Sequence, residues 1–273
     1  MIQFDTQLLA LICGHFCGDF ILQSERMVTL KQTHSLWMCA HAAIVALITW
    51  LLLGNLSAWW LMTIIAATHL LIDTYKIRIN SERMQTAAVP PGAAEQRTGD
   101  NASNSHYSRI FFWFFFDQAL HLLVLILLWS LLRSDSGSLF AYNSWSLLWG
   151  SDYSKALILV TGLALGVCAV GVVLKMQMAQ LASALPNISS RGLPRGGKTI
   201  GTLERLLVFL FVLAGRPEGI GFVVAAKSVF RIGDLTNRAE RDQAEYIMIG
   251  TLRSFTYALV FAFTTQWLIR QVG

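Results

Sequence analysis

The sequence predicts an all-α fold, namely a polytopic integral membrane bundle with about eight apolar segments. Of the 273 residues, 55% are hydrophobic and only 14% are charged, whereas a typical soluble domain is roughly 25% charged. The mean hydropathy is +0.53. Several apolar runs approach the ~20 residues that a helix needs to cross a bilayer. Composition and run length therefore both indicate membrane helices.

The apolar segments alternate with polar loops along the whole chain. Their approximate limits are residues 7–23, 36–54, 58–78, 109–132, 155–176, 201–215, 217–231 and 246–269. The sixth and seventh are short and are separated by Gly215-Arg216-Pro217, so we expect a helical hairpin that only partly spans the membrane. A change of composition near residues 134–154 predicts an N-terminal four-helix module, residues 1–133, and a C-terminal helical module, residues 134–273.

The basic residues of the loops predict the orientation of the chain. Loops after the odd-numbered segments are rich in Lys and Arg, whereas loops after the second, fourth and sixth segments carry few. Basic loops stay on the cytoplasmic side, so we expect both termini outside. No basic residue precedes the first apolar run, so we expect no removable signal peptide. Aromatic residues are not interleaved with the basic ones, which argues against a nucleic-acid partner and favours membrane lipid.

Histidine and aspartate residues gather inside the first four segments. The set comprises His15, Asp19, His41, His69, Asp73, Asp117 and His121. Six of the seven form pairs four residues apart, and residues at this spacing share one helix face, with Cβ atoms ~5–6 Å apart. On the predicted topology all seven fall towards the cytoplasmic ends of their segments. We therefore expect one shallow layer near the cytoplasmic leaflet.

Ionisable groups inside a membrane cost free energy and are usually functional. Seven of them in one layer must therefore neutralise or hydrogen-bond one another. A divalent metal would supply such compensation, and imidazole together with carboxylate suits Zn, Mn or Fe. We predict one or two ions, with the ligands His15, His41, His69, Asp73, Asp117 and His121. Asp19 is predicted as a catalytic base or a further ligand. Lys31 is predicted as a catalytic cation that neutralises the substrate, with Lys76 or Arg78 as alternatives. The simpler interpretation is a set of separate polar contacts that pack the helices together.

Basic side chains also lie at the predicted cytoplasmic ends of the C-terminal segments. Arg205, Lys227 and Arg231 are candidates for binding an anionic head group. Lys227 and Arg231 are four residues apart and share a helix face, which suits a phosphate. Interfacial snorkelling and ordinary ion pairs are the alternative interpretation.

Several motifs resemble those of a known family. The opening motif is His15-Phe-Cys-Gly-Asp19-Phe-Ile-Leu-Gln23, followed by Lys31 and His41. It resembles the start of an uncharacterised bacterial integral membrane family. Three further motifs of the chain resemble the C-terminal half of that family. They are Gly201-x-x-Glu204-Arg205, Ala226-Lys227-Ser228 and Glu245-Tyr246-x-x-x-Gly250-Thr251. The resemblance covers most of the chain and implies the cytoplasmic membrane of a bacterium. The HxxxD pattern is also similar to that of membrane-bound metal-dependent hydrolases, a likeness that implies no substrate.

Three hypotheses of function follow from these predictions. The leading one is a membrane-embedded metal-dependent hydrolase that acts at the cytoplasmic leaflet on a phosphorylated or ester-linked lipid. The second is a transporter or ion-conducting protein in which the same groups carry protons or metal ions, although transporters usually bind near the midplane. The third is a non-enzymatic scaffold or partner subunit in which the polar layer is structural.

Overall fold

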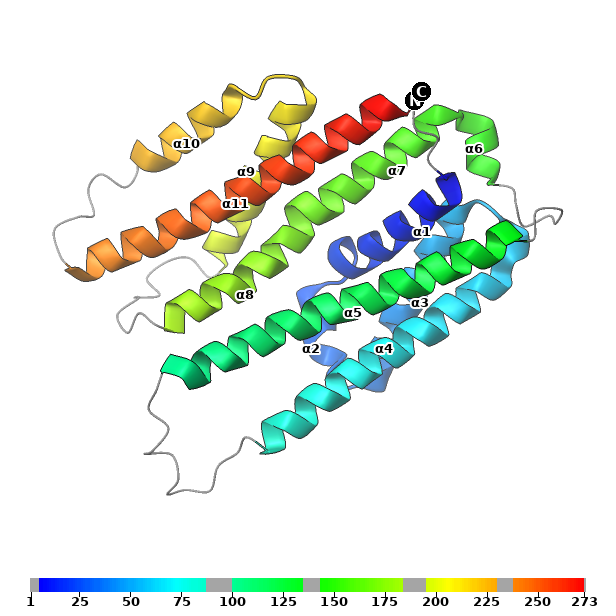
Figure 1. Ribbon diagram of the computed structural model, residues 1–273, viewed down its shortest axis with the longest axis horizontal. Coiled ribbons are helices and arrows are strands. Elements are labelled where there is room, and N and C mark those ends of the chain that lie inside the picture. The colour runs from blue at the N-terminus through cyan, green and yellow to red at the C-terminus, as the bar shows by residue number, and fades with distance from the viewer. Residues whose placement is uncertain (1–4, 87–99, 135–142, 184–194, 230–237, 273) are drawn as a thin grey trace. The chain divides into compact units, whose positions relative to one another are not determined.

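A computed structural model shows the chain as a series of helices (Figure 1). It describes residues 5–86, 100–134, 143–183, 195–229 and 238–272, and every regular element within them is helical. The elements are α1 (Thr6–Phe16), η1 (Cys17–Ile21), α2 (Glu25–Leu30), α3 (Ser35–Leu53), η2 (Leu56–Ala58), α4 (Trp59–Thr86), α5 (Asp100–Ser134), α6 (Ser144–Trp149), α7 (Ser151–Leu163), η5 (Ala164–Ala169), α8 (Val170–Ser183), α9 (Gly196–Leu213), α10 (Gly219–Val229) and α11 (Arg238–Gln271). Two of them, η1 and η5, are π-helical turns. The all-helical prediction is confirmed for these residues.

Four helical stretches of the described chain are long and apolar enough to cross a membrane. They are Ser35–Leu53, Ser108–Arg133, Ser151–Ala182 and Asp242–Gln271. These stretches correspond to the second, fourth, fifth and eighth predicted segments and are consistent with membrane association. The prediction of about eight spans is not confirmed.

The other four predicted segments form helices that are too short or too polar. The first is an apolar helix limited to Thr6–Ile21. Helix α4 has 28 residues, but His69 and Asp73 interrupt its apolar part, and Lys76 and Arg78 follow. Helix α9 has 18 residues and includes Glu204 and Arg205. Helix α10 has 11 residues, a rise of about 16 Å, whereas the hydrocarbon core is roughly 30 Å thick.

The chain divides into two compact units. Unit 1 consists of Met1–Thr98, Phe112–Thr161 and Ile269–Gly273, and unit 2 consists of Gly99–Phe111 and Gly162–Leu268. Unit 1 therefore contains α1 to α4, α6 and most of α5 and α7. All seven predicted His and Asp residues lie in unit 1.

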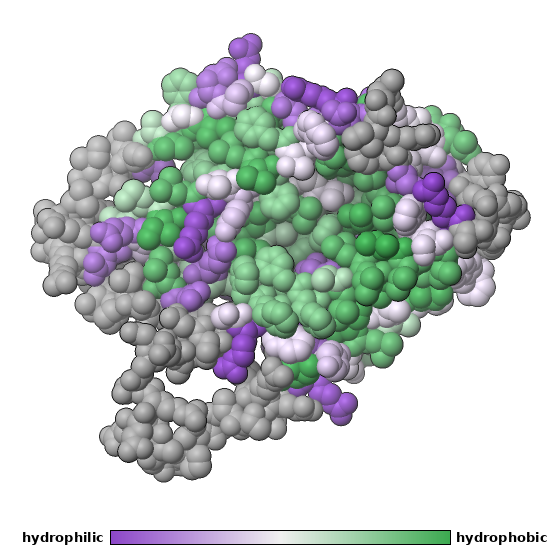
Figure 2. Space-filling model, in the orientation of Figure 1, coloured by the Kyte–Doolittle hydropathy of each residue, from purple (hydrophilic) through white to green (hydrophobic). Residues whose placement is uncertain are grey.

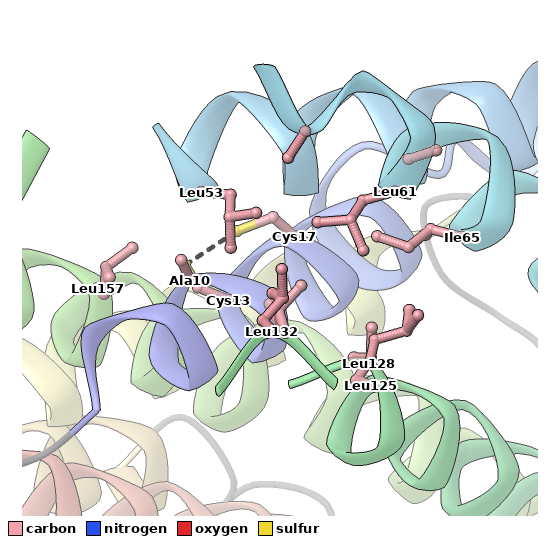
Figure 3. Packing of buried hydrophobic residues seen from close by; sticks show 13 residues of the cluster. Ala10, Cys13, Cys17, Leu53, Leu61, Ile65, Leu125, Leu128, Leu132 and Leu157 are labelled. Atoms are coloured by element: carbon pink, nitrogen blue, oxygen red, sulfur yellow. Dashed lines mark hydrogen bonds between the residues drawn. The ribbon is translucent and has the colours of Figure 1, made fainter. Parts of the chain in front are cut away.

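An apolar core joins α1, α3, α4 and α5 in unit 1 (Figure 3). Helix α3 packs against both α1 and α4. The buried members of the core are Ala10, Leu11, Cys13, Cys17, Ala46, Leu53, Ala58, Leu61, Ile65, Leu125, Leu128, Leu132 and Leu157. This core holds together the helices that carry the predicted site residues.

Two glycines allow α1 and η1 to approach α3 closely, as their small-xxx-small spacing predicts. A Cβ atom on Gly14 would lie 2.5 Å from the Cα atom of Thr49. A Cβ atom on Gly18 would lie 2.6 Å from Cγ2 of Val45. Any larger residue would push the helices apart. Because these glycines flank His15, the close approach brings the end of α1 next to the helix that carries a second predicted histidine.

Unit 2 joins α9 to the π-helical turn η5 through a buried arginine. The side chain of Arg205 is 5% exposed, and its Nε atom donates to the carbonyl oxygen of Val167 at 2.9 Å. A Cβ atom on Gly171 would lie 2.8 Å from Nη2 of Arg205, so this glycine makes room for the guanidinium. A π-turn shifts backbone bonding to i→i+5, and the arginine supplies a donor to a carbonyl in that turn.

Hydrophobic residues cover much of the visible surface (Figure 2). Large apolar side chains that are more than half exposed include Leu36, Leu71, Leu131, Phe222 and Leu252. Soluble monomers rarely expose extended apolar patches. Such a surface is consistent with helices whose outer faces contact lipid.

Candidate metal centre

Four helices of unit 1 bring the predicted His and Asp side chains into one buried group, which we call the His/Asp cluster. Its members are His15 and Asp19 from α1 and η1, His41 from α3, His69 and Asp73 from α4, and Asp117 and His121 from α5. Six of them are only 1–4% exposed, and the Asp19 side chain is 11% exposed. Overlapping groups of three hold ligand atoms within 4.8 Å of one another. Buried charge of this kind must be compensated inside the protein.

The π-helical turn η1 positions Asp19 within the cluster. The amide of Leu22 donates to the carbonyl oxygen of Cys17 at 2.9 Å, an i→i+5 bond. The carboxylate lies with Oδ2 3.9 Å from Nε2 of His15. Single π-turns within α-helices are frequent at functional sites. The spacing of four residues predicted a shared helix face, but it did not predict this turn.

Four donor atoms converge between η1, α3 and α4, and we call this arrangement the first site. The Nε2 atoms of His41 and His69 are 3.1 Å apart. Asp19 Oδ1 lies 3.4 Å from each of these nitrogens, and Asp73 Oδ2 lies 3.9 Å from each. Ligands about 2.0–2.1 Å from a tetrahedral zinc ion would be roughly 3.3 Å apart. The separations that involve the two imidazole nitrogens therefore fit the ligand shell of one metal ion.

One carboxylate oxygen of the first site lacks a hydrogen-bond partner within the described ranges, and this shows whether the site suits a cation. Among the described residues, Asp19 Oδ1 is buried and has no hydrogen-bond partner. Leaving a charged acceptor in this state costs more than the roughly 1–3 kcal/mol of a neutral one. A cation between this oxygen and the two imidazoles would satisfy it, and the mixed imidazole–carboxylate donors suit Zn, Mn or Fe. The residues present fit a divalent metal.

Two lysines bind carboxylates of the cluster. Lys31 Nζ lies 2.7 Å from Asp73 Oδ2, and Lys76 Nζ lies 2.6 Å from Asp117 Oδ2. The lysine side chains are 14% and 28% exposed, so they lie at the edge of the cluster. The sequence predicted Lys31 as a site residue but did not predict which carboxylate either lysine binds.

A second set of donor atoms lies between α4 and α5, and we call it the second set. It consists of Asp73, Asp117 and His121. Nδ1 of His121 lies 2.9 Å from the carbonyl oxygen of Asp117. Within the described part of the chain, Nε2 of His121 and Oδ1 of Asp117 are both buried without a hydrogen-bond partner.

Gln118 on α5 connects His15 to Asp19. Its Oε1 atom lies 3.3 Å from Nε2 of His15, and its Nε2 atom donates to Asp19 Oδ2 at 3.2 Å. An amide oxygen only accepts, so Nε2 of His15 carries the proton in this arrangement. The role of His15 as a metal ligand stays a prediction. Sequence reasoning missed Gln118 because a neutral amide gives no charge signal, and its only marker was its place next to Asp117.

Gln23 closes the cluster on the side of α2. With its side-chain oxygen facing the cluster, that oxygen accepts from Lys31 Nζ at 2.7 Å and from His41 Nε2 at 3.2 Å. The amide nitrogen then donates to the carbonyl oxygen of Asp19 at 3.3 Å, so this orientation satisfies both ends. A metal ion at Nε2 of His41 would displace the proton there, as metal binding to histidine does in general.

A small internal space adjoins three histidines of the cluster. His15, His69 and His121 line it together with apolar side chains, and its volume is about 10 Å³. The rings of His15 and His121 stack with their centroids 5.0 Å apart. This volume is on the order of the room that one water molecule needs. The space suits an ion or a water molecule.

Comparison with known proteins places the His/Asp cluster within a family. Residues 7–148, just over half of the chain, match the family model described as "Protein of unknown function (DUF3307)". The chain belongs to this family. No curated protein and no solved structure matches it. The DUF3307 match includes all seven cluster residues together with Gln23, Lys31, Lys76 and Gln118. It does not test the likeness to metal-dependent hydrolases.

The residues predicted to bind an anionic head group lie outside the DUF3307 match. Arg205 is buried, and its guanidinium bonds to Val167 and to two neighbouring hydroxyl groups. Lys227 Nζ pairs with Glu204 Oε2 at 2.7 Å. Arg231 lies outside the described residues. A role for these residues in binding an anion stays a prediction. Arg205 and Lys227 would have to share or leave their present partners within unit 2 to bind one.

Proposed function

We propose that this protein is a membrane-embedded, metal-dependent hydrolase that acts on a phosphorylated or ester-linked lipid at the cytoplasmic leaflet. The observation that carries the proposal is the first site, where two imidazole nitrogens lie 3.1 Å apart and two carboxylate oxygens lie 3.4 Å and 3.9 Å from both of them. One of these oxygens has no hydrogen-bond partner among the described residues. A divalent ion bound there would act as a Lewis acid and activate water for attack on an ester.

The residues around the first site have separate roles in the proposed reaction. Asp19 faces the site through Oδ1, while Gln118 holds its Oδ2 atom. With Oδ1 on the metal, the Oδ2 atom of this carboxylate would accept the proton of the attacking water, and Gln118 would keep it oriented. A positioned base of this kind typically contributes roughly 10²–10⁴-fold to the rate.

The two lysines would neutralise the substrate. Lys31 and Lys76 each contact one carboxylate and remain partly exposed at the edge of the cluster. An ammonium group in this position can turn from its carboxylate towards an anionic head group, because lysine presents three donors on a flexible stem.

The basic residues in the connection before α3 support the cytoplasmic leaflet as the place of reaction. His41 is six residues from Ser35 at the start of α3, a rise of about 9 Å. The polar connection before that end of α3 carries Arg26 and Lys31, and basic connections mark the cytoplasmic side. A lipid of that leaflet would present its head group near this depth.

Lipid hydrolysis by the purified full-length protein tests the proposal. The protein is reconstituted with Zn²⁺ or Mn²⁺ into vesicles that contain phosphatidic acid or phosphatidylglycerol, and released phosphate and fatty acid are measured. We expect release to fall at least about 100-fold after chelation or in His69→Ala, because both remove the metal. His34→Ala is the matched control, since His34 is exposed, and it should keep wild-type activity. Metal-loaded protein that releases no more than His69→Ala from either lipid would rule out the proposal.

Ion conduction is the second candidate function, and one observation favours it. The space beside the histidines has room for an ion rather than for a lipid group, and buried His and Asp groups in membrane segments often mark ion pathways. Flux of Zn²⁺, Mn²⁺ or protons into proteoliposomes, abolished in His69→Ala and retained in His34→Ala, would favour this function over hydrolysis.

A further inference from the structure

We infer that the His/Asp cluster binds a second divalent ion on Asp73, Asp117 and His121, and that the resulting two-metal centre takes a phosphate monoester as its substrate. The inference rests on the proposed function and deepens it. It assigns a role to Asp117 and His121, which the first site does not use.

The tautomer of His121 supplies the first argument. Its Nδ1 atom lies 2.9 Å from the carbonyl oxygen of Asp117. A carbonyl oxygen only accepts, so Nδ1 must carry the proton and Nε2 must present a lone pair. This lone pair is buried with no donor in the described part of the chain. Metal-binding histidines commonly show this arrangement, in which one nitrogen donates to a backbone carbonyl and the other binds the ion.

Asp117 supplies the second argument. It is 3% exposed, and Lys76 bonds only to its Oδ2 atom. The Oδ1 atom has no partner among the residues that the structure describes. Two orphaned acceptors, one imidazole nitrogen and one carboxylate oxygen, therefore occur on the same turn of α5. Oδ1 lies 3.8 Å from Nδ1 of the His121 ring, and the inferred ion would bind Nε2 of that ring and this oxygen.

Asp73 connects the two sites. It forms a ligand group with His41 and His69 and another with Asp117 and His121, each within 4.8 Å. A carboxylate has two oxygens and can bridge two ions, and two-metal hydrolytic centres hold their ions roughly 3.5–4 Å apart. Helix bundles build such centres from inward carboxylates and histidines on facing helices.

Charge identifies the class of substrate. The three carboxylates and two lysines of the cluster leave one negative charge. One divalent ion brings the total to one positive charge, and transfer of a proton from water to Asp19 leaves that total unchanged. A second divalent ion raises it to three positive charges. A phosphate monoester carries about two negative charges at neutral pH, so the two-metal cluster can neutralise it whereas the one-metal cluster cannot.

The reaction is hydrolysis without any change of oxidation state. The oxygen of water forms a bond to phosphorus, and the bond between phosphorus and the lipid oxygen breaks. The departing oxygen takes up a proton, so the products are inorganic phosphate and the lipid alcohol. In-line displacement of this kind is the reaction that paired metal ions stabilise at both the attacking and the leaving oxygen.

Manganese binding to the metal-stripped, full-length protein tests the inference. Mn²⁺ is titrated and counted per chain, and the electron paramagnetic resonance spectrum is recorded. We expect two ions per chain and a spectrum of two exchange-coupled ions. Asp117→Asn should bind one ion and give an uncoupled spectrum, whereas Asp152→Asn, which changes an exposed carboxylate, should behave as wild type. With two ions bound, inorganic phosphate should bind at least about tenfold more tightly than to Asp117→Asn.

The possible outcomes separate this inference from the proposed function. One ion per chain in the wild type would overturn the second site and leave the hydrolase proposal standing, whereas no bound ion would overturn both. Two uncoupled ions, or two ions retained in Asp117→Asn, would place the second ion elsewhere and overturn the inference. Phosphate that binds no more tightly than sulfate would overturn the substrate class. The coupled spectrum of the wild type decides the question even if Asp117→Asn does not fold.

Discussion

Replacement of Asp73 by Asn is expected to lower the affinity for metal by more than about 100-fold and to abolish hydrolysis. Loss of a group that only supports a ligand costs roughly 10- to 100-fold in metal affinity, and Asp73 is proposed as a direct ligand. Its Oδ2 atom lies 3.9 Å from Nε2 of both His41 and His69 and 2.7 Å from Lys31 Nζ. An amide keeps the size of the side chain but removes the charge that both the metal and the lysine require.

A competition titration against a zinc-binding indicator measures this effect. Asp152→Asn is the matched control, because the Asp152 side chain is 78% exposed and pairs with Lys155 on the same helix. The control should bind zinc as the wild type does. If Asp73→Asn bound zinc within threefold of the control, Asp73 would not be a ligand.

Replacement of Arg205 by Leu is expected to lower the free energy of unfolding by at least about 3 kcal/mol. A hydrogen bond from a charged group contributes roughly 1.5–3 kcal/mol, and Arg205 donates to Val167 and to hydroxyl groups on two further residues. Leucine would also leave space beside Gly171, where the guanidinium now packs. A backbone carbonyl that loses its hydrogen bond within a membrane segment adds several kcal/mol to such losses.

Equilibrium unfolding in mixed detergent micelles, followed by circular dichroism, measures the loss. Arg216→Leu is the control, because Arg216 is 78% exposed and its partner Glu218 is 64% exposed. Exposed ion pairs contribute about 0–1 kcal/mol, so the control should stay within that range. An equal effect of the two substitutions would mean that Arg205 does not anchor α9 to η5.

The fold was predictable where a segment is uniformly apolar. The segment at 36–54 was predicted almost to its ends, because α3 contains few polar residues and none that is formally charged. Segments that combine an apolar face with buried polar groups were harder to interpret. Helix α4 continues to Thr86, well beyond the predicted end at residue 78, because a polar helix can extend past a membrane surface without any apolar signal.

The candidate site was predictable where helical spacing alone places the residues. The pairs led by His15 and His69 share a helix face by geometry, and their common depth in the membrane stays a prediction from loop charge. The neutral partners were not predictable from pattern. Gln118 carries no charge, and η1 leaves no mark in the spacing because a π-turn shifts the register by a single residue. Long-range partners such as Lys31 and Asp73 depend on how helices pack, which spacing within one helix does not record.

The metal content of the detergent-purified protein is the most direct test of the central claim, a divalent metal bound by the His/Asp cluster. Wild-type protein and His34→Ala should each carry at least one Zn, Mn or Fe ion per chain by elemental analysis. His69→Ala should carry less than a tenth of that amount, because it removes an imidazole that faces both His41 and Asp19. Wild-type protein without stoichiometric metal, or a metal content that His69→Ala leaves unchanged, would contradict the claim.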